Sequence, residues 1–137
     1  MSYKEVTVLL VEDDEVDVMA VLRAFERAKI GNPVKVAHDG IEALEILREG
    51  AVNKPFLILL DLNMPRMNGL EFLDVIRADK NLKDAVVFVL TTSKAEEDKC
   101  AAYQHNIAGY IVKERVGEEF LDAVSLLSHY WKIVELP

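Results

Sequence analysis

The sequence is short of cysteine, of long apolar runs and of clustered basic residues. Cys100 is its one cysteine in 137 residues, so no disulfide framework is available. No apolar run approaches the roughly 20 residues that span a bilayer, and the first residues lack the apolar segment of a signal peptide. The 16 basic residues are outnumbered by 24 acidic ones and form no basic stripe. We therefore expect a cytoplasmic protein that binds neither nucleic acid nor membrane.

Low-complexity segments and repeats of fixed period are also absent from the sequence. The length suits one domain, which we place at residues 1–137. Hydrophobic residues make up 51% of the chain and charged residues 29%, as in globular proteins that bury a sizeable core. We expect the last residues, about 130–137, to form a C-terminal extension of this domain.

Short apolar runs alternate with longer segments of helical periodicity along the chain. The runs are mostly continuous and aliphatic, as expected for parallel strands buried on both faces. They occupy residues 6–11, 34–37, 56–60, 86–90 and 109–112. The predicted helices begin near residues 16, 41, 70, 95 and 118. This order predicts an α/β fold with a doubly wound, five-stranded parallel sheet and five helices.

Polar or charged residues directly follow every predicted strand, and those after the first, third, fourth and fifth strands suggest a common site. Glu12 and Asp13 follow the first strand and Asp61 the third, while Thr91 follows the fourth and Lys113 the fifth. The functional crevice of such a sheet lies at the carboxyl ends of its strands. We therefore expect these five side chains to form one site.

Carboxylates that converge on one point repel each other, and a bound cation offsets that repulsion. Two unit charges about 4 Å apart interact by roughly 4 kcal/mol at an effective dielectric constant near 20. Hard oxygen ligands without a histidine or cysteine cluster favour Mg²⁺ over zinc. A carboxylate beside Mg²⁺, a hydroxyl and a lysine is typical of phosphoryl transfer, in which the carboxylate is the nucleophile.

Four segments of the chain together resemble the receiver domain of two-component response regulators. They are "VLLVEDDEVD", "ILLDLNMPRMNG", "VFVLTTS" and "GYIVK", and their order and spacing agree with that family over nearly the whole chain. The resemblance implies a flavodoxin-like receiver fold and a phosphorylation-controlled signalling switch. It also implies that a sensor histidine kinase is the phosphoryl donor and that the domain promotes only its own phosphorylation and dephosphorylation.

The resemblance also implies roles for individual residues around the acidic cluster. Asp61 would be the phosphoacceptor, and Glu12 and Asp13 would form the acidic pair of a Mg²⁺ site. Asp13 would bind the metal directly, as would the backbone carbonyl of Asn63. Pro65 would stiffen the loop that carries Asn63, because its ring fixes φ near −65°.

Three further residues complete the site that the resemblance implies. Thr91 and Tyr110 would form the switch pair, and Lys113 would contact the phosphoryl group. Most receivers have proline after this lysine, whereas Glu114 stands here. The Lys113–Glu114 bond is therefore either trans with a shifted loop or cis and strained.

The segments "LTTSKAEED" and "YWKIVELP" further resemble small, single-domain regulators that serve cyanobacterial phytochromes. A phytochrome is accordingly the kinase that we expect as partner. Trp131 is either part of the core or part of a dimer contact, and we favour the dimer contact. A homodimer would use the C-terminal extension and the face formed by the fourth helix, the fifth strand and the fifth helix.

Two other classes of protein remain open. A Mg²⁺-dependent phosphohydrolase of the haloacid dehalogenase type also uses an aspartate at a strand end, but it carries a second aspartate where Asn63 stands. A receiver-like module that only binds partners is the other alternative. Asp61, Thr91 and Lys113 would have no chemical task in such a module.

The loops allow three local predictions. Asp14 should cap the first helix. Asn68 and Gly69 suit positive φ angles before the third helix. Thr92 or Ser93 should cap the fourth.

Overall fold

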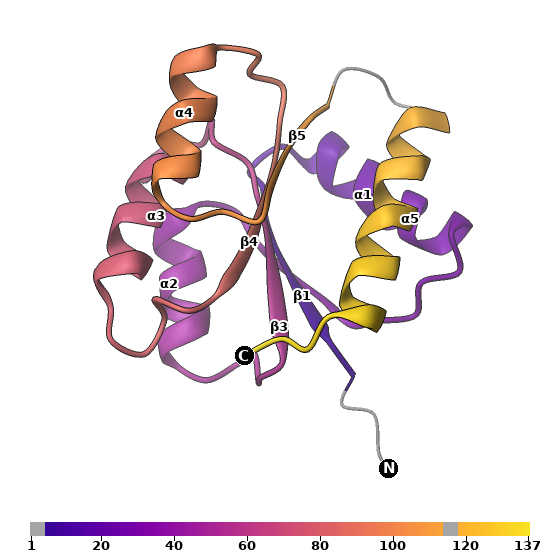
Figure 1. Ribbon diagram of the computed structural model, residues 1–137, viewed down its shortest axis with the longest axis horizontal. Helices are drawn as coiled ribbons and strands as arrows, with labels where there is room; N and C mark the ends of the chain where they lie inside the picture. Colours follow the sequence, from indigo (N-terminus) through magenta and orange to yellow (C-terminus); the bar gives the residue numbers. More distant parts are fainter. Residues whose placement is uncertain (1–4, 114–117) are drawn as a thin grey trace.

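Five parallel strands form a single sheet in the order β2-β1-β3-β4-β5 (Figure 1). The computed structural model describes residues 5–113 and 118–137, and of residues 118–124 and 131 it describes the backbone alone. The elements are β1 (Thr7–Val11), α1 (Glu15–Arg27), β2 (Val34–Ala37), α2 (Gly40–Arg48), β3 (Phe56–Leu60), α3 (Gly69–Ala78), β4 (Val86–Thr91), α4 (Glu96–Gln104), β5 (Gly109–Val112) and α5 (Glu118–Ile133). The predicted doubly wound fold is thereby confirmed.

The sheet separates two hydrophobic cores, and β3 contributes to both. Helices α1 and α5 lie on one face of the sheet, and α2, α3 and α4 lie on the other (Figure 1). Along the fully buried β3, Leu57 and Leu59 pack towards α1 and α5, whereas Ile58 and Leu60 pack towards the other three helices. Side chains that alternate between the two faces explain why this strand is a continuous apolar run.

Polar caps fix the starts of three helices. The Asp14 side chain accepts hydrogen bonds from the first-turn amides of α1, and Asp39 caps α2 in the same way. Asn68 forms a reciprocal capping box with Glu71 at the start of α3. The predicted cap of α1 is therefore correct. The predicted cap of α4 is wrong, because its N-cap residue is Ala95, which makes no side-chain hydrogen bond.

The loop before α3 also differs from its prediction. Asn68 has a φ of −76°, Gly69 has no positive φ, and Arg66 adopts the left-handed conformation instead, with φ of 59°. Gly69 is needed for space. A Cβ there would lie 2.6 Å from the backbone oxygen of Asp61 and 2.7 Å from the Cα of Leu62. The glycine thus lets the start of α3 lie directly against the end of β3.

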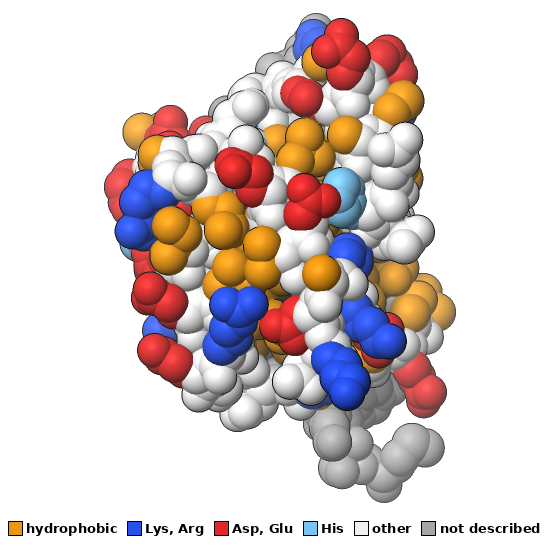
Figure 2. All heavy atoms as spheres, turned by 90° about the vertical axis from the view of Figure 1, so that its left-hand side faces the viewer, with side chains coloured by type: hydrophobic (Ala, Val, Ile, Leu, Met, Phe, Trp, Pro, Cys, Tyr) orange, Lys and Arg blue, Asp and Glu red, His pale blue; other side chains and the backbone are white. Residues whose placement is uncertain are grey.

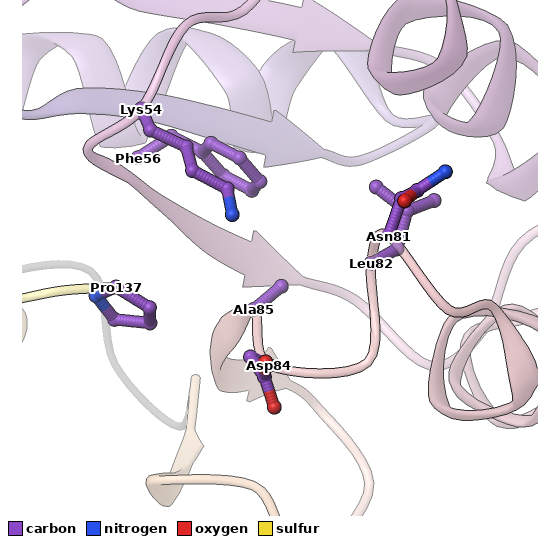
Figure 3. Close-up of a pocket in the computed structure, with 7 residues that line it drawn as sticks. All are labelled: Lys54, Phe56, Asn81, Leu82, Asp84, Ala85 and Pro137. Atoms are coloured by element: carbon purple, nitrogen blue, oxygen red, sulfur yellow. The ribbon is translucent and has the colours of Figure 1, made fainter.

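The C-terminal residues lie at the opposite edge of the sheet from the carboxyl ends of the strands. Helix α5 continues to Ile133, so residues 130–133 belong to it, and Leu136 packs against the core beneath α1. Pro137 lines a small pocket beside the starts of β3 and β4 (Figure 3); its other lining residues are Lys54, Phe56, Asn81, Leu82, Asp84 and Ala85. Of the residues expected to form an extension, only those after Ile133 lie beyond the last helix.

The face that carries α2, α3 and α4 shows acidic and basic side chains interspersed, with small hydrophobic groups between them (Figure 2). Within residues 5–113 and 118–137, no helix combines the length and the apolar character that crossing a membrane requires.

Candidate functional site

Three carboxylates meet at the carboxyl ends of two neighbouring strands. Glu12 and Asp13 follow β1, and Asp61 follows β3. Parallel pairing aligns Val11 with Leu60, and the Asp61 amide donates to the Val11 carbonyl at 3.0 Å. Carboxylate oxygens of the three acids consequently lie within 4.8 Å of one another. The sequence-based expectation that these acids come together is met by this geometry.

Burial makes this acidic cluster costly. Glu12 is 2% exposed and Asp61 7%, whereas Asp13 faces solvent. Burial raises the pKa of Glu12 to about 7, with a further contribution from Asp61, against the opposing effect of Lys113. Two buried carboxylates side by side therefore need a positive charge if both are to ionise.

Lys113 supplies one such charge from the end of β5. Its Nζ donates to Glu12 Oε1 and, at 3.0 Å, to Asp17 Oδ2 on α1. Burial alone would lower the pKa of Lys113, but the adjacent Glu12 and Asp61 carboxylates raise it. The structure thus places the lysine in the site. The predicted alternatives for the Lys113–Glu114 bond lie outside the described residues.

A line of hydrogen bonds connects Thr91 to Tyr110. Thr91 is completely buried, whereas Thr92 is exposed. The Thr91 Oγ1 accepts from the Ser93 amide at 3.3 Å, and the Tyr110 hydroxyl donates to the Ser93 carbonyl at 2.9 Å. Ser93 Oγ in turn donates to Asp98 of α4 at 2.6 Å. The predicted switch pair therefore contacts one loop, residues 92–95.

The donor set of this site fits a divalent cation of the Mg²⁺ type. Glu12, Asp13 and Asp61 offer hard carboxylate oxygens. Asn63 lies beyond Asp61 at the rim of an open groove that Asp13 also lines; the other lining residues are Leu62, Met64, Pro65, Asn68, Leu70 and Asp98. A small cation bound by carboxylates could keep water ligands in such a groove.

Two acidic residues at the site escaped the sequence analysis. Asp17 contacts Lys113, and Asp98 contacts Ser93. Asp17 had a detectable signal, because it lies three residues after the cap Asp14 in a helix that starts at the same edge of the sheet. Asp98 had none, because its contact depends on how α4 sits against the loop after β4.

Comparison with known proteins finds one family over most of the chain. The family described as "Response regulator receiver domain" matches residues 8–125. The probable methanogenesis regulatory protein FilR2 of Methanothrix harundinacea is 35% identical over 127 residues, which cover 90% of this chain and 82% of that protein. Response regulator Rcp1 of Synechocystis is 33% identical over 135 residues, or 95% of this chain and 92% of that protein.

Solved structures give the same result. The phosphorylated cyanobacterial phytochrome response regulator RcpA superposes with a TM-score of 0.86 at 33% identity, covering 98% of this chain and 99% of that one. The Mn²⁺-bound form of Rcp1 gives a TM-score of 0.83 at 34% identity, with the same coverage of both chains. Both similarities extend over the site as well as the sheet.

Proposed function

The chain belongs to the response regulator receiver family, and we propose that it is a signalling switch whose Asp61 accepts a phosphoryl group from a sensor histidine kinase. The observation that carries this proposal is the meeting of three carboxylates, a lysine and a buried threonine at one sheet edge. Each has a task in phosphoryl transfer to a carboxylate.

In the proposed reaction, an Asp61 carboxylate oxygen attacks phosphorus, and the phosphorus–nitrogen bond of the donor phosphohistidine breaks. The leaving imidazole takes up a proton, and Asp61 becomes an acyl phosphate. Glu12, Asp13, Asp61 and the Asn63 carbonyl would hold Mg²⁺, which neutralises charge that develops on the phosphoryl oxygens. Lys113 would exchange its bonds with Glu12 and Asp17 for one to a phosphoryl oxygen.

The proposed response to phosphorylation runs through the loop after β4. The Thr91 hydroxyl would turn towards the new phosphoryl oxygens and release the Ser93 amide. The Tyr110 hydroxyl donates to the Ser93 carbonyl, and this hydrogen bond would break when Ser93 moves. Because Asp98 also holds Ser93, the change would reach α4.

We further propose a phytochrome as the kinase, since the Rcp1 and RcpA similarities cover both chains almost completely. A homodimer would use the face formed by α4, β5 and α5, where Tyr103 and Leu126 are exposed, together with the exposed Ile133 and Val134 near the C-terminus. The proposed role of the Trp131 side chain in this contact lies outside the described residues. The domain would act in the cytoplasm, without nucleic acid, and catalyse only the gain and loss of its own phosphoryl group.

Intact mass after incubation with acetyl phosphate and Mg²⁺ tests the proposal. We expect wild type to gain one phosphoryl group, and we expect no gain for Asp61→Asn or in the presence of EDTA. Asp74→Asn is a matched control, because Asp74 is an exposed carboxylate outside the site.

An adduct that persists in Asp61→Asn would move the acceptor elsewhere. No adduct from acetyl phosphate or from a phosphorylated kinase domain would favour a module that only binds partners. Continuous release of phosphate from simple phosphate esters would favour the phosphohydrolase.

A further inference from the structure

Arg66 and Asp39 join two loops at the carboxyl edge of the sheet. Arg66 lies in the loop between β3 and α3, and its Nε donates to Asp39 Oδ2 at 2.6 Å. Asp39 is the N-cap of α2, and its other oxygen accepts from the Glu42 amide at 2.9 Å. Arg66 is thus tied to the first turn of another helix.

The two ends of this ion pair differ in exposure. The Asp39 side chain is 7% exposed and that of Arg66 59%. Burial opposes ionisation of Asp39, but the hydrogen bonds from Arg66 and from the α2 amides hold the pKa of its carboxyl below its usual value. A buried carboxylate that accepts hydrogen bonds from both Arg66 and the Glu42 amide is a fixed anchor, onto which the exposed arginine is drawn.

The backbone around Arg66 is held at further points. The Gly40 amide donates to the Met67 carbonyl at 3.2 Å, and a Cβ on Gly40 would lie 2.7 Å from Met67 Cγ. At the base of the loop, the Gly69 amide donates to the Leu62 carbonyl at 2.9 Å. Between these points lies Asn63, the proposed carbonyl ligand of the metal. The loop is therefore closed at its base and attached sideways to α2.

Arg66 also adopts a backbone conformation that is uncommon for a residue with a side chain. Its φ of 59° lies in the left-handed region, which is sterically unfavourable for residues other than glycine. The contact with Asp39 offsets this cost. A position that suits glycine but carries arginine indicates that its side chain has a task.

We propose that the Asp39–Arg66 ion pair is a positioning device for the metal-binding loop, which sets the affinity of the acidic cluster for a divalent cation. The pair touches neither the metal site nor Asp61. It acts by fixing residues 62–68 against α2, so that the Asn63 carbonyl faces the carboxylates before the cation arrives. This inference rests on the proposed function, because it takes that cluster to be the metal site.

Arg66→Gly is the most informative variant. Glycine adopts positive φ without strain, so this change removes the ion pair while it keeps the backbone conformation. We expect the Kd for Mg²⁺ from isothermal titration calorimetry to rise roughly 10-fold, as is common when a residue that orients metal ligands is lost. Arg66→Lys keeps one charge and should give an intermediate Kd.

Arg48→Ala is the matched control. Arg48 of α2 also pairs with an aspartate, Asp79 at the end of α3, but that pair lies away from the loop. Its loss should leave the Kd for Mg²⁺ within twofold of wild type. Asp13→Asn, which removes a proposed ligand, should weaken binding more than Arg66→Gly does.

A phosphorylation assay separates positioning from general damage. With acetyl phosphate, Arg66→Gly should need a higher Mg²⁺ concentration for half-maximal phosphorylation and should reach the wild-type rate at saturating Mg²⁺. A rate that stays low at saturating Mg²⁺ would overturn the positioning role. A Kd within twofold of wild type, or an equal loss in Arg48→Ala, would overturn it as well.

The two proposals fail in different ways. If Asp13→Asn weakens Mg²⁺ binding and Arg66→Gly does not, the positioning role is wrong and the metal site stands. If wild type binds no Mg²⁺, both are wrong. If Arg66→Gly does not fold, Asp39→Asn provides the same test, because asparagine keeps an oxygen to cap α2 but loses the charge that holds Arg66.

Discussion

Helices α3 and α4 flank the same site but are held in place very differently. Helix α3 begins with a capping box at Asn68 and buries Phe72, Leu73 and Ile76 completely. Helix α4 begins at Glu96, its N-cap residue Ala95 provides no side-chain cap, and Ala102 is its one buried residue. The two helices are neighbours on one face of the sheet (Figure 1).

This difference matches what each helix would have to do. Helix α3 follows the loop that carries Asn63, and that loop must keep its shape for a metal to bind. Helix α4 follows the loop at Ser93, which must move if Thr91 is to reach a phosphoryl oxygen. Elements that move in a switch come from the less stable part of a fold. The firmly packed α3 and the loosely packed α4 thus lie side by side next to Asp61.

The largest expected effect is on the buried face of α3. Phe72→Ala should lower the free energy of unfolding by about 3–5 kcal/mol, because it leaves a cavity in the core. Tyr103→Ala, on the exposed face of α4, should change it by less than about 0.5 kcal/mol. Urea denaturation measures both. If both variants lose the same free energy of unfolding, α3 and α4 do not differ in how firmly they are packed.

Arg77 carries the next largest effect. Its guanidinium donates to the backbone carbonyls of His105, Lys83, Ala85 and Asn106 at 2.6 to 3.2 Å. Arg77→Ala removes all four bonds, two of them to the part-buried carbonyls of His105 and Ala85, and should cost about 2–3 kcal/mol in urea denaturation. The control is Arg48→Ala, which breaks an exposed pair and should cost less than about 1 kcal/mol. A similar loss in both variants would contradict this account.

The helix caps offer a test in both directions. Asn68→Ala removes the cap of α3 and should cost about 1 kcal/mol, whereas Ala95→Ser adds one to α4 and should gain about 0.5–1 kcal/mol. The free energy of unfolding measures both changes. Ala95→Ser should also reduce the change in amide hydrogen exchange that phosphorylation causes in α4. A stabilised α4 that responds like wild type would argue against its movement.

The smallest expected effect is a pH dependence at the end of α4. The His105 ring has acceptors at both nitrogens, the Ala101 carbonyl and Asp74 of α3. It forms both bonds only as imidazolium, and Asp74 is the main cause of its raised pKa. Because the folded pKa exceeds the usual 6.5, the stabilisation is complete below 6.5 and is lost as pH rises through the folded value.

As pH rises from about 6.5 through the raised folded pKa of His105, the His105→Gln variant should therefore lose less stability than wild type. The difference should stay below about 1 kcal/mol, because Asp74 is 72% exposed. Urea midpoints across this range are the measurement. If the urea midpoints of the two proteins change with pH in parallel, His105 contributes nothing to the pH dependence of stability.

The sequence allowed the fold to be predicted because its signals are local. Buried parallel strands are apolar runs, and the structure changes only their ends: β1 begins at Thr7 instead of Val6, and β4 includes Thr91. The polar residues that follow the strands also predicted the acidic cluster, because the topology itself brings those ends together.

Contacts set by tertiary packing escaped prediction. The bond from Lys113 to Asp17 joins residues 96 positions apart, and no periodicity reports it. The residue types predict positive φ at Asn68 and Gly69, which commonly adopt that conformation, whereas the structure has it at Arg66. The glycine at position 69 is explained by packing instead, because a side chain there would clash with the end of β3.

Hydrogen–deuterium exchange with and without acetyl phosphate and Mg²⁺ tests the central claim most directly. We predict that phosphorylation changes amide exchange in residues 91–104, the end of β4 through α4, and leaves α3 unchanged. Asp61→Asn should show no change in either helix. Unchanged exchange in α4 of a fully phosphorylated protein, or the same change in Asp61→Asn, would contradict the account.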